Sequence, residues 1–349
     1  MGIKYNKFYR WYKNSLSEFK TQKEQYKLHK HDIKKENFNS RYEQNIRVPI
    51  LKLEHLGTHM AIDEKHINQT FYTVLTNGET GKVALMIASM NPKEVGKCLV
   101  KFGEKLLEVT TITRDLSPTY QAIATKYFPN AKQVADKYHI IAQSIDAVQD
   151  VRIKLRQEIL TNQRKEEQEH TLKYQEYKKK SKENLDENLV KIVKKYSPKK
   201  LKNGETLAEL LARSRYLLFK KPTKWNDYQK ERSILLFEHF PVLKKSYDIV
   251  NQFRNWYEPL LIKDKIWNYL TAETALLNWI YTIENCGIDE ILNLKNSIEN
   301  NLQYILNYHF EYKTNAVAES INAKIKNAIQ QNKGSRDLDF FHFRLNLIL

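Results

Sequence analysis

The feature that most constrains the fold is the order of strand-like and helix-like segments between residues 59 and 136. Three apolar or β-branched runs come first, at 60–63, 71–75 and 82–88, and Asn77 to Gly81 is typical of a hairpin turn between the last two. A helical pattern at 92–105, a strand-like run at 107–113, a helix from Pro118 and a strand-like run at 132–135 follow. This order predicts a mixed five-stranded sheet with helices packed against it.

The order β-β-β-α-β-α-β is typical of the ribonuclease H-like α/β fold, in which the first and fourth strands are neighbours. Asp63 would end the first strand and Asp115 the fourth, so the fold order predicts that their carboxylates lie side by side. Glu319 is expected on a helix that begins near residue 315. Clustered carboxylates repel each other unless divalent cations neutralise them, and hard oxygen ligands suit Mg²⁺ or Mn²⁺. Most single acids, however, simply face solvent, so the residues alone leave both interpretations open.

The rest of the chain is predicted to be helical. Only 9 Gly and 8 Pro occur in 349 residues, which favours long helices. Strand signals stop after residue 140, and apolar helical patterns with a predicted aromatic core of Trp256, Trp267 and Trp279 take their place. The predicted organisation has four parts: a basic N-terminal helical segment at 1–50, the first part of the catalytic domain at 51–145, an all-α insertion at 146–312 and C-terminal helices completing the catalytic domain at 313–349.

The chain is strongly basic, with a formal net charge of +17. Residues 1–50 hold 12 basic and 5 acidic side chains, and residues 151–200 hold 15 and 8. Such an excess is explained either by solubility or by a polyanionic partner such as nucleic acid. Aromatic residues recur at helical spacing in the first segment: Tyr5, Phe8, Tyr9, Tyr12 and Phe19. This spacing favours a helix with a buried aromatic face over a surface on which bases stack.

The cysteine count and the apolar pattern exclude several classes of protein. Two cysteines, Cys98 and Cys286, are too few for a zinc finger or a disulfide framework. The N-terminus lacks an apolar leader, and no run of 18 apolar residues occurs. We therefore expect a soluble intracellular protein without a membrane partner.

Around the three acids the sequence resembles a known family, the DDE transposases of bacterial insertion sequences, and specifically their ISL-three group. The stretches that carry the resemblance lie in order along residues 50–349: Ile62-Asp63-Glu64, Thr113-Arg-Asp115-Leu-Ser-Pro-Thr-Tyr120, Phe128-Pro-Asn-Ala131, Val134-Ala-Asp136-Lys-Tyr-His139, Thr314-Asn-Ala-Val-Ala-Glu319-Ser-Ile-Asn322-Ala-Lys-Ile-Lys326, and Phe341-His-Phe-Arg344.

The resemblance implies a DNA transposase that performs metal-dependent 3′-end cleavage and strand transfer, with two Mg²⁺ or Mn²⁺ ions. Asp63, Asp115 and Glu319 would be the catalytic acids and metal ligands. Asp136 competes with Asp115 for the second place, and His139, in the same Asp-x-x-His element, is either a site residue or an ordinary packed histidine. Two alternatives are a ribonuclease H-like nuclease without strand transfer and a catalytically inactive DNA-binding derivative.

The resemblance also implies partners and points of departure. DNA is the expected partner, and the expected contacts are Asn322, Lys324, Lys326 and Arg344. We also expect a homo-oligomer that is located in the bacterial cytoplasm and associated with the nucleoid. Small residues replace the usual glycines beside Glu319, and Gln330-Gln331 replaces a basic pair. The group's usual N-terminal zinc-binding and helix-turn-helix region is not recognisable, which suggests a separately encoded N-terminal DNA-binding polypeptide.

Overall fold

The computed structural model describes residues 4–25, 48–67, 70–182, 195–258, 269–311, 327, 330 and 337–349. Contacts divide the chain into two compact units. Unit 1 comprises Met1–Ile140 with Asn301–Leu349, and unit 2 comprises Ile141–Asn300. The predicted site residues Glu319, Asn322, Lys324 and Lys326 lie outside the described residues. The predicted domain limits stay a prediction.

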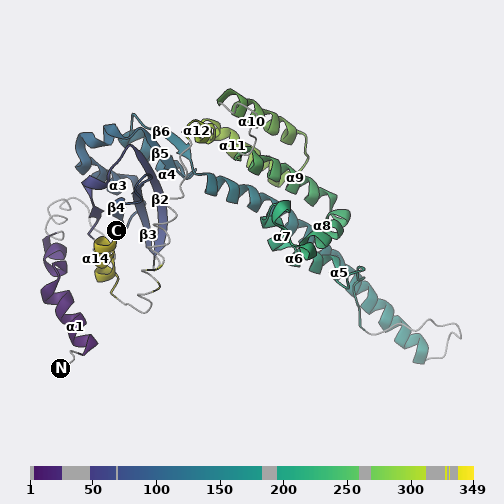
Figure 1. Ribbon diagram of the computed structural model, residues 1–349. Helices are drawn as coiled ribbons and strands as arrows, with labels where there is room; N and C mark the ends of the chain where they lie inside the picture. The colour runs from purple at the N-terminus through teal and green to yellow at the C-terminus, as the bar shows by residue number, and fades with distance from the viewer. Residues whose placement is uncertain are drawn as a thin grey trace. The chain divides into compact units, whose positions relative to one another are not determined.

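Unit 1 is built on a six-stranded mixed sheet (Figure 1). The strands lie in the order β1-β4-β3-β2-β5-β6. Neighbours from β1 to β2 are antiparallel, whereas β5 and β6 run parallel to β2. The strands are β1 (Ile50–Leu51), β2 (His59–Ile67), β3 (Thr70–Asn77), β4 (Val83–Ile87), β5 (Thr111–Arg114) and β6 (Lys132–Ala135). The predicted adjacency of the first and fourth long strands, β2 and β5, is confirmed.

The sheet corrects the sequence prediction in three places. The predicted five strands are six, because Ile50–Leu51 pairs along β4 as an edge strand too short to show any alternation. Asp63 does not end its strand, since β2 continues to Ile67 by pairing with β3 across a hairpin. The strand expected from residue 107 begins only at Thr111, because a 3₁₀ segment occupies Val100–Glu108.

The hairpin predicted between β3 and β4 is confirmed. The Asn77 side chain accepts hydrogen bonds from the backbone N–H groups of Glu79 (2.9 Å) and Thr80 (3.0 Å). Gly81 closes the turn with a φ of 69°, a left-handed conformation that glycine adopts without steric cost. The turn therefore fixes the register between β3 and β4, and this register determines which side chains of each strand face each side of the sheet.

Helices cover both faces of this sheet. Side chains of α3 (Pro92–Leu99) and α4 (Pro118–Tyr127) share one buried cluster with Leu75 and Leu85. The alternate residues of the same strands, such as Val74, share a second cluster with α14 (Leu338–Ile348). Because successive side chains of a strand point to opposite faces of the sheet, one run of apolar residues contributes to both buried clusters. α12 (Leu302–Glu311) packs on β6.

The basic N-terminal segment packs against α14. Phe340 makes edge-on ring contacts with Tyr9 of α1 (Tyr5–Trp11), with Tyr12 in the π-helical turn Tyr12–Leu16, and with Phe19. Two ion pairs, Lys13 with Asp337 and Lys23 with Asp339, join the same elements. The packing interpretation is confirmed for Tyr9, Tyr12 and Phe19, whereas the Phe8 ring is 46% exposed and the Tyr5 side chain lies outside the described part of the structure.

The described residues of unit 2 form helices and no strand. Its helices are the continuation of α5 (Lys137–Lys182), α6 (Leu207–Arg213), α7 (Arg215–Phe219), α8 (Asp227–His239), α9 (Pro241–Trp256), α10 (Tyr269–Glu284) and α11 (Asp289–Asn300), with a 3₁₀ turn at Pro222–Lys224. Trp256 and Trp279 are buried as predicted and each donates its indole N–H to a backbone carbonyl at 2.8 Å. Trp267 lies outside the described residues. No helix in the described part of the chain is long and apolar enough to span a membrane.

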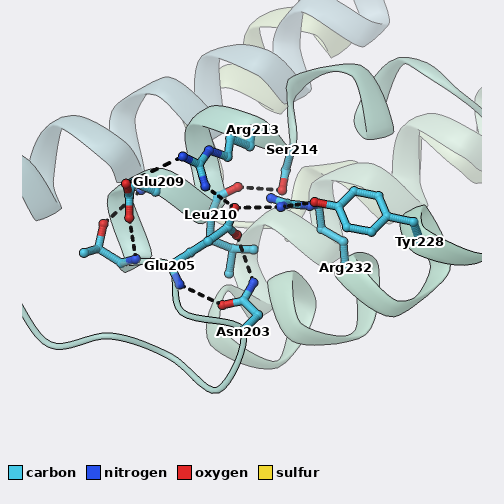
Figure 2. Close-up of polar contacts among 9 residues, drawn as sticks. Asn203, Glu205, Glu209, Leu210, Arg213, Ser214, Tyr228 and Arg232 are labelled. Carbon is cyan, nitrogen blue, oxygen red and sulfur yellow. Dashed lines mark hydrogen bonds and ion pairs between the residues drawn. The ribbon is translucent and has the colours of Figure 1, made fainter.

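A buried carboxylate organises the start of unit 2 (Figure 2). Glu205 Oε1 accepts hydrogen bonds from Arg213 and from Arg232, each at 2.7 Å, and Asn203 donates to the other oxygen at 2.9 Å. The side chains of Glu205 and Arg232 are only 8% and 6% exposed. Burial raises the pKa of Glu205, but the two arginines outweigh it and hold the pKa below its ordinary value.

Candidate active site

Three aspartates lie at the same level of three neighbouring parallel strands, Asp63 within β2 and Asp115 and Asp136 directly after β5 and β6. Ile62 of β2 pairs with Arg114 of β5, and Arg114 pairs with Ala135 of β6. The next residue along each strand is therefore Asp63, Asp115 or Asp136, and the Asp136 N–H donates to the Arg114 carbonyl at 2.7 Å. Parallel strands present their carboxyl ends at one edge, where α/β sheets bind ligands.

Asp63 is the member of this group that lies on β2. Its Oδ1 accepts the backbone N–H of Glu64 at 2.7 Å, and its Oδ2 forms an ion pair with Lys65. The carboxylate is 24% exposed, so it is accessible from solvent. It therefore offers an oxygen ligand at the place that sequence reasoning predicted, although in mid-strand.

Asp115 lies in the connection between β5 and α4. Its Oδ1 accepts the backbone N–H of Ser117 at 2.9 Å, which fixes the carboxylate beside the start of α4. Burial is the main cause that raises the pKa of Asp115, and the negative charge of Asp63 raises it further. The Ser117 hydrogen bond and the charges of His139 and Arg114 act in the opposite direction. The two carboxylates thus interact electrostatically, as expected for neighbours that share a site.

Asp136 and His139 complete the described part of the cluster. Asp136 is 8% exposed, and its Oδ1 accepts the Tyr138 N–H at 2.9 Å in the first turn of α5. The Nε2 atom of His139 lies 3.8 Å from Asp63 Oδ1 and 3.8 Å from Asp136 Oδ2. The imidazole therefore lies between the two carboxylates, with 41% of its side chain exposed.

Arg114 is a site residue that sequence reasoning missed. It is fully buried, donates from Nε to Gln133 Oε1 at 2.7 Å and from Nη1 to the Asp115 carbonyl at 2.8 Å, and packs 4.4 Å above the Tyr304 ring. Burial lowers the pKa of its guanidinium. One feature of the sequence could have identified Arg114: it is a charged residue at the end of an apolar strand, next to a predicted catalytic acid. Its Nη2 atom is buried with no hydrogen-bond partner among the described residues.

α12 is held against β5, β6 and α4. Besides the Arg114 contact, Tyr304 accepts a hydrogen bond from Gln121 at 3.0 Å, and Asn307 donates to the Gln133 carbonyl at 2.8 Å. α12 ends at Glu311, and Glu319 follows shortly after it in the sequence. Arg344, predicted to contact DNA, lies on α14 with its guanidinium 5.5 Å from the Phe340 ring.

The described acids offer oxygen donors but not a complete metal site. Carboxylate oxygens such as those of Asp63 and Asp115 are the ligands that Mg²⁺ and Mn²⁺ prefer, and their mutual repulsion favours a bound cation. Within the described ranges, however, no group of three or more His, Cys, Asp or Glu side chains is placed to hold a metal ion. The carboxylate oxygens that are present are of the kind that a hard divalent cation prefers. Glu319, the remaining predicted ligand, lies outside those ranges.

A comparison with protein families places the chain in a known group. A family model described as a transposase, that of the ISL-three group of DDE transposases, matches residues 60–345. The matched range includes Asp63, Asp115 and Asp136. No curated protein matches the chain.

Proposed function

The chain belongs to the ISL-three family of DDE transposases, and from this premise we propose that it cleaves the 3′ ends of an insertion-sequence element and joins them to target DNA. The adjacency of Asp63 and Asp115 on parallel strands carries the proposal. Burial is the main cause that raises the pKa of Asp115, and the charge of Asp63 adds to it, so the two carboxylates repel each other. Such an arrangement is stable when divalent cations neutralise it.

In this proposal Asp63, Asp115 and Glu319 are the catalytic acids and hold two Mg²⁺ or Mn²⁺ ions. The bound ions supply Lewis-acid activation of the attacking oxygen and charge neutralisation at the leaving oxygen of an in-line displacement. Asp63 and Asp115 contribute oxygens that the backbone N–H groups of Glu64 and Ser117 orient. Arg114 fixes the backbone at Asp115 through its carbonyl.

We assign the second acid to Asp115 rather than to Asp136. Each of these carboxylates accepts one backbone N–H near the start of a helix, so this bond does not separate them. Asp136, however, is nearly buried, whereas Asp115 is only partly buried and is therefore more accessible to a metal ion. His139, placed between Asp63 and Asp136, then orients both carboxylates from the side.

DNA is the proposed partner, and the excess of basic residues supplies sequence-independent affinity for its phosphates. Asn322, Lys324, Lys326 and Arg344 are the proposed contacts near the active site. We further propose that the helices of unit 2 are an insertion in the catalytic domain, that the protein acts as a homo-oligomer, and that a separately encoded polypeptide assists recognition of the element's ends.

A strand-transfer assay with pre-nicked ends, target plasmid and Mg²⁺ tests the chemistry. The wild-type protein is expected to join the ends, and Asp63→Asn and Asp115→Asn to abolish joining while retaining DNA binding. Glu94→Gln removes an exposed carboxylate on α3, in the same unit but outside the aspartate cluster, and is the matched control. It should join ends as the wild type does.

Two results would contradict the proposal. Hydrolysis of the DNA without joining would indicate a nuclease. Joining that survives Asp115→Asn but is lost in Asp136→Asn would move the second acid to Asp136.

A further inference from the structure

Unit 2 contains a group of arginines that is distinct from the carboxylate site. At its centre is Arg152 of α5, only 7% exposed. It donates from Nε to Gln149 Oε1 at 2.7 Å and from Nη1 to the Leu211 carbonyl at 3.2 Å. These bonds hold the guanidinium between α5 and the end of α6.

Two further arginines lie beside Arg152. Arg156 is one helical turn further along α5, on the same face. Its Nε atom is buried and has no hydrogen-bond partner among the described residues. Arg215 begins α7, and its carbonyl accepts a hydrogen bond from the same Gln149 at 3.2 Å. We call Arg152, Arg156 and Arg215 the unit 2 arginine cluster.

The charge of this cluster is not compensated within the described part of unit 2. The other buried arginine nearby, Arg232, has Glu205 as its partner at 2.7 Å. No described carboxylate forms an ion pair with a member of the cluster. Burial, and then the charges of Arg215 and Arg156, lower the pKa of Arg152. Three neighbouring cations without an anion cost free energy, which a bound anion would recover.

The surroundings favour a large planar or polymeric anion. The Arg215 guanidinium is exposed at the surface and lies 5.7 Å from the ring of Tyr216, which is itself 71% exposed. Exposed aromatic rings next to arginines are typical of nucleic-acid surfaces. Arginine binds phosphate oxygens with two parallel N–H groups, a geometry that lysine lacks.

We propose that the unit 2 arginine cluster binds the phosphate backbone of duplex DNA. The choice of DNA rests on the proposed transposase function, and the net charge of +17 agrees with it. Arg156 and Arg215 contact phosphates directly, whereas Arg152 holds the two helices in place and adds to the local potential. Because these are phosphate contacts, binding is independent of base sequence.

The test measures binding of the full-length protein to a fluorescently labelled duplex of arbitrary sequence, by anisotropy over a series of salt concentrations. The variants are Arg156→Gln, Arg215→Gln and their combination. The slope of log affinity against log salt is negative, and each lost phosphate contact should reduce its magnitude by about 0.9. This change corresponds to about eightfold weaker binding than that of the wild type at 0.1 M salt. Arg164→Gln, an exposed arginine further along α5, is the matched control for loss of one positive charge.

DNA affinity is expected to fall strongly in Arg156→Gln and in Arg215→Gln, and only slightly in Arg164→Gln. The thermal stability of the free protein should be unchanged or raised, because repulsion between the arginines is relieved. Equal losses for all three variants would indicate general electrostatic attraction and overturn the proposal. Unchanged DNA binding with altered oligomeric state in light scattering would also overturn it, in favour of a protein partner. The binding assay needs no catalysis, so Asp115→Asn should bind normally, and a failure of strand transfer by the wild type remains distinguishable.

Discussion

Removing the charge of Glu205 should destabilise unit 2 strongly. The substitution Glu205→Gln preserves the shape of the side chain but leaves the Arg232 guanidinium, 6% exposed, without a counter-charge. Breaking a buried ion pair by removing one partner costs about 3–5 kcal/mol. Arg213 adds little to this loss, because its side chain is 59% exposed and water screens it.

Urea unfolding followed by tryptophan fluorescence measures this loss. Trp225, Trp256 and Trp279 all belong to unit 2, so the signal reports mainly on its unfolding. Glu238→Gln, an exposed acid on the same helix as Arg232, is the control and should change the free energy of unfolding by less than about 0.5 kcal/mol. The double variant Glu205→Leu with Arg232→Met should recover most of the stability, since apolar replacement of both partners is often neutral.

The pH dependence gives an independent check. The folded-state pKa of Glu205 lies below its ordinary value, so its stabilising contribution is present above the unfolded pKa and is lost as pH falls through the folded pKa. The difference between the wild type and Glu205→Gln should therefore shrink on acidification below about pH 4.3. A loss under about 1 kcal/mol at pH 7, or a difference that does not shrink in acid, would refute the reasoning.

Three further predictions concern unit 1. Phe340→Ala should lower the free energy of unfolding by about 3–5 kcal/mol in denaturant titrations followed by circular dichroism, because the ring is buried among aromatic residues; Phe8→Ala, with a ring 46% exposed, should cost far less. Burial raises the pKa of Asp337, but the bond from Lys13 outweighs it, so the net shift is downward. Asp337→Asn should accordingly flatten the loss of thermal stability between pH 5 and pH 2, and an unchanged profile would contradict the pairing. Arg114→Lys keeps the buried charge but lacks the planar fork, so strand transfer should fall about tenfold or more with the fold retained, whereas wild-type rates would remove Arg114 from the site.

Local sequence patterns determined most of the secondary structure around the site. Apolar and β-branched runs marked the antiparallel strands, and Asn77 with Gly81 marked the turn between β3 and β4. Proline at the first position marked the start of α4. These features depend on residues close together in the chain, so their physical causes can be read from the sequence itself.

Element order carried the prediction one step further. Because the fold order makes β2 and β5 neighbours, Asp63 and Asp115 could be placed together before any contact was known. The strand ends were less predictable. The extension of β2 past Asp63 depends on pairing with β3, and β1 exists only because β4 offers it an edge.

Side-chain partners distant in sequence were decided by the tertiary structure alone. The sequence placed a basic residue before Asp115, but only the docking of α12 brings Tyr304 over Arg114, and only the pairing of β5 with β6 brings Gln133 beside it. Likewise, only the packing of α5 against α6 and α7 brings Arg215 to Arg152 and Arg156, from which it is distant in the chain. Local propensity determines which elements form, whereas burial against distant elements determines which charges meet, and the sequence pattern carries no local signal for that.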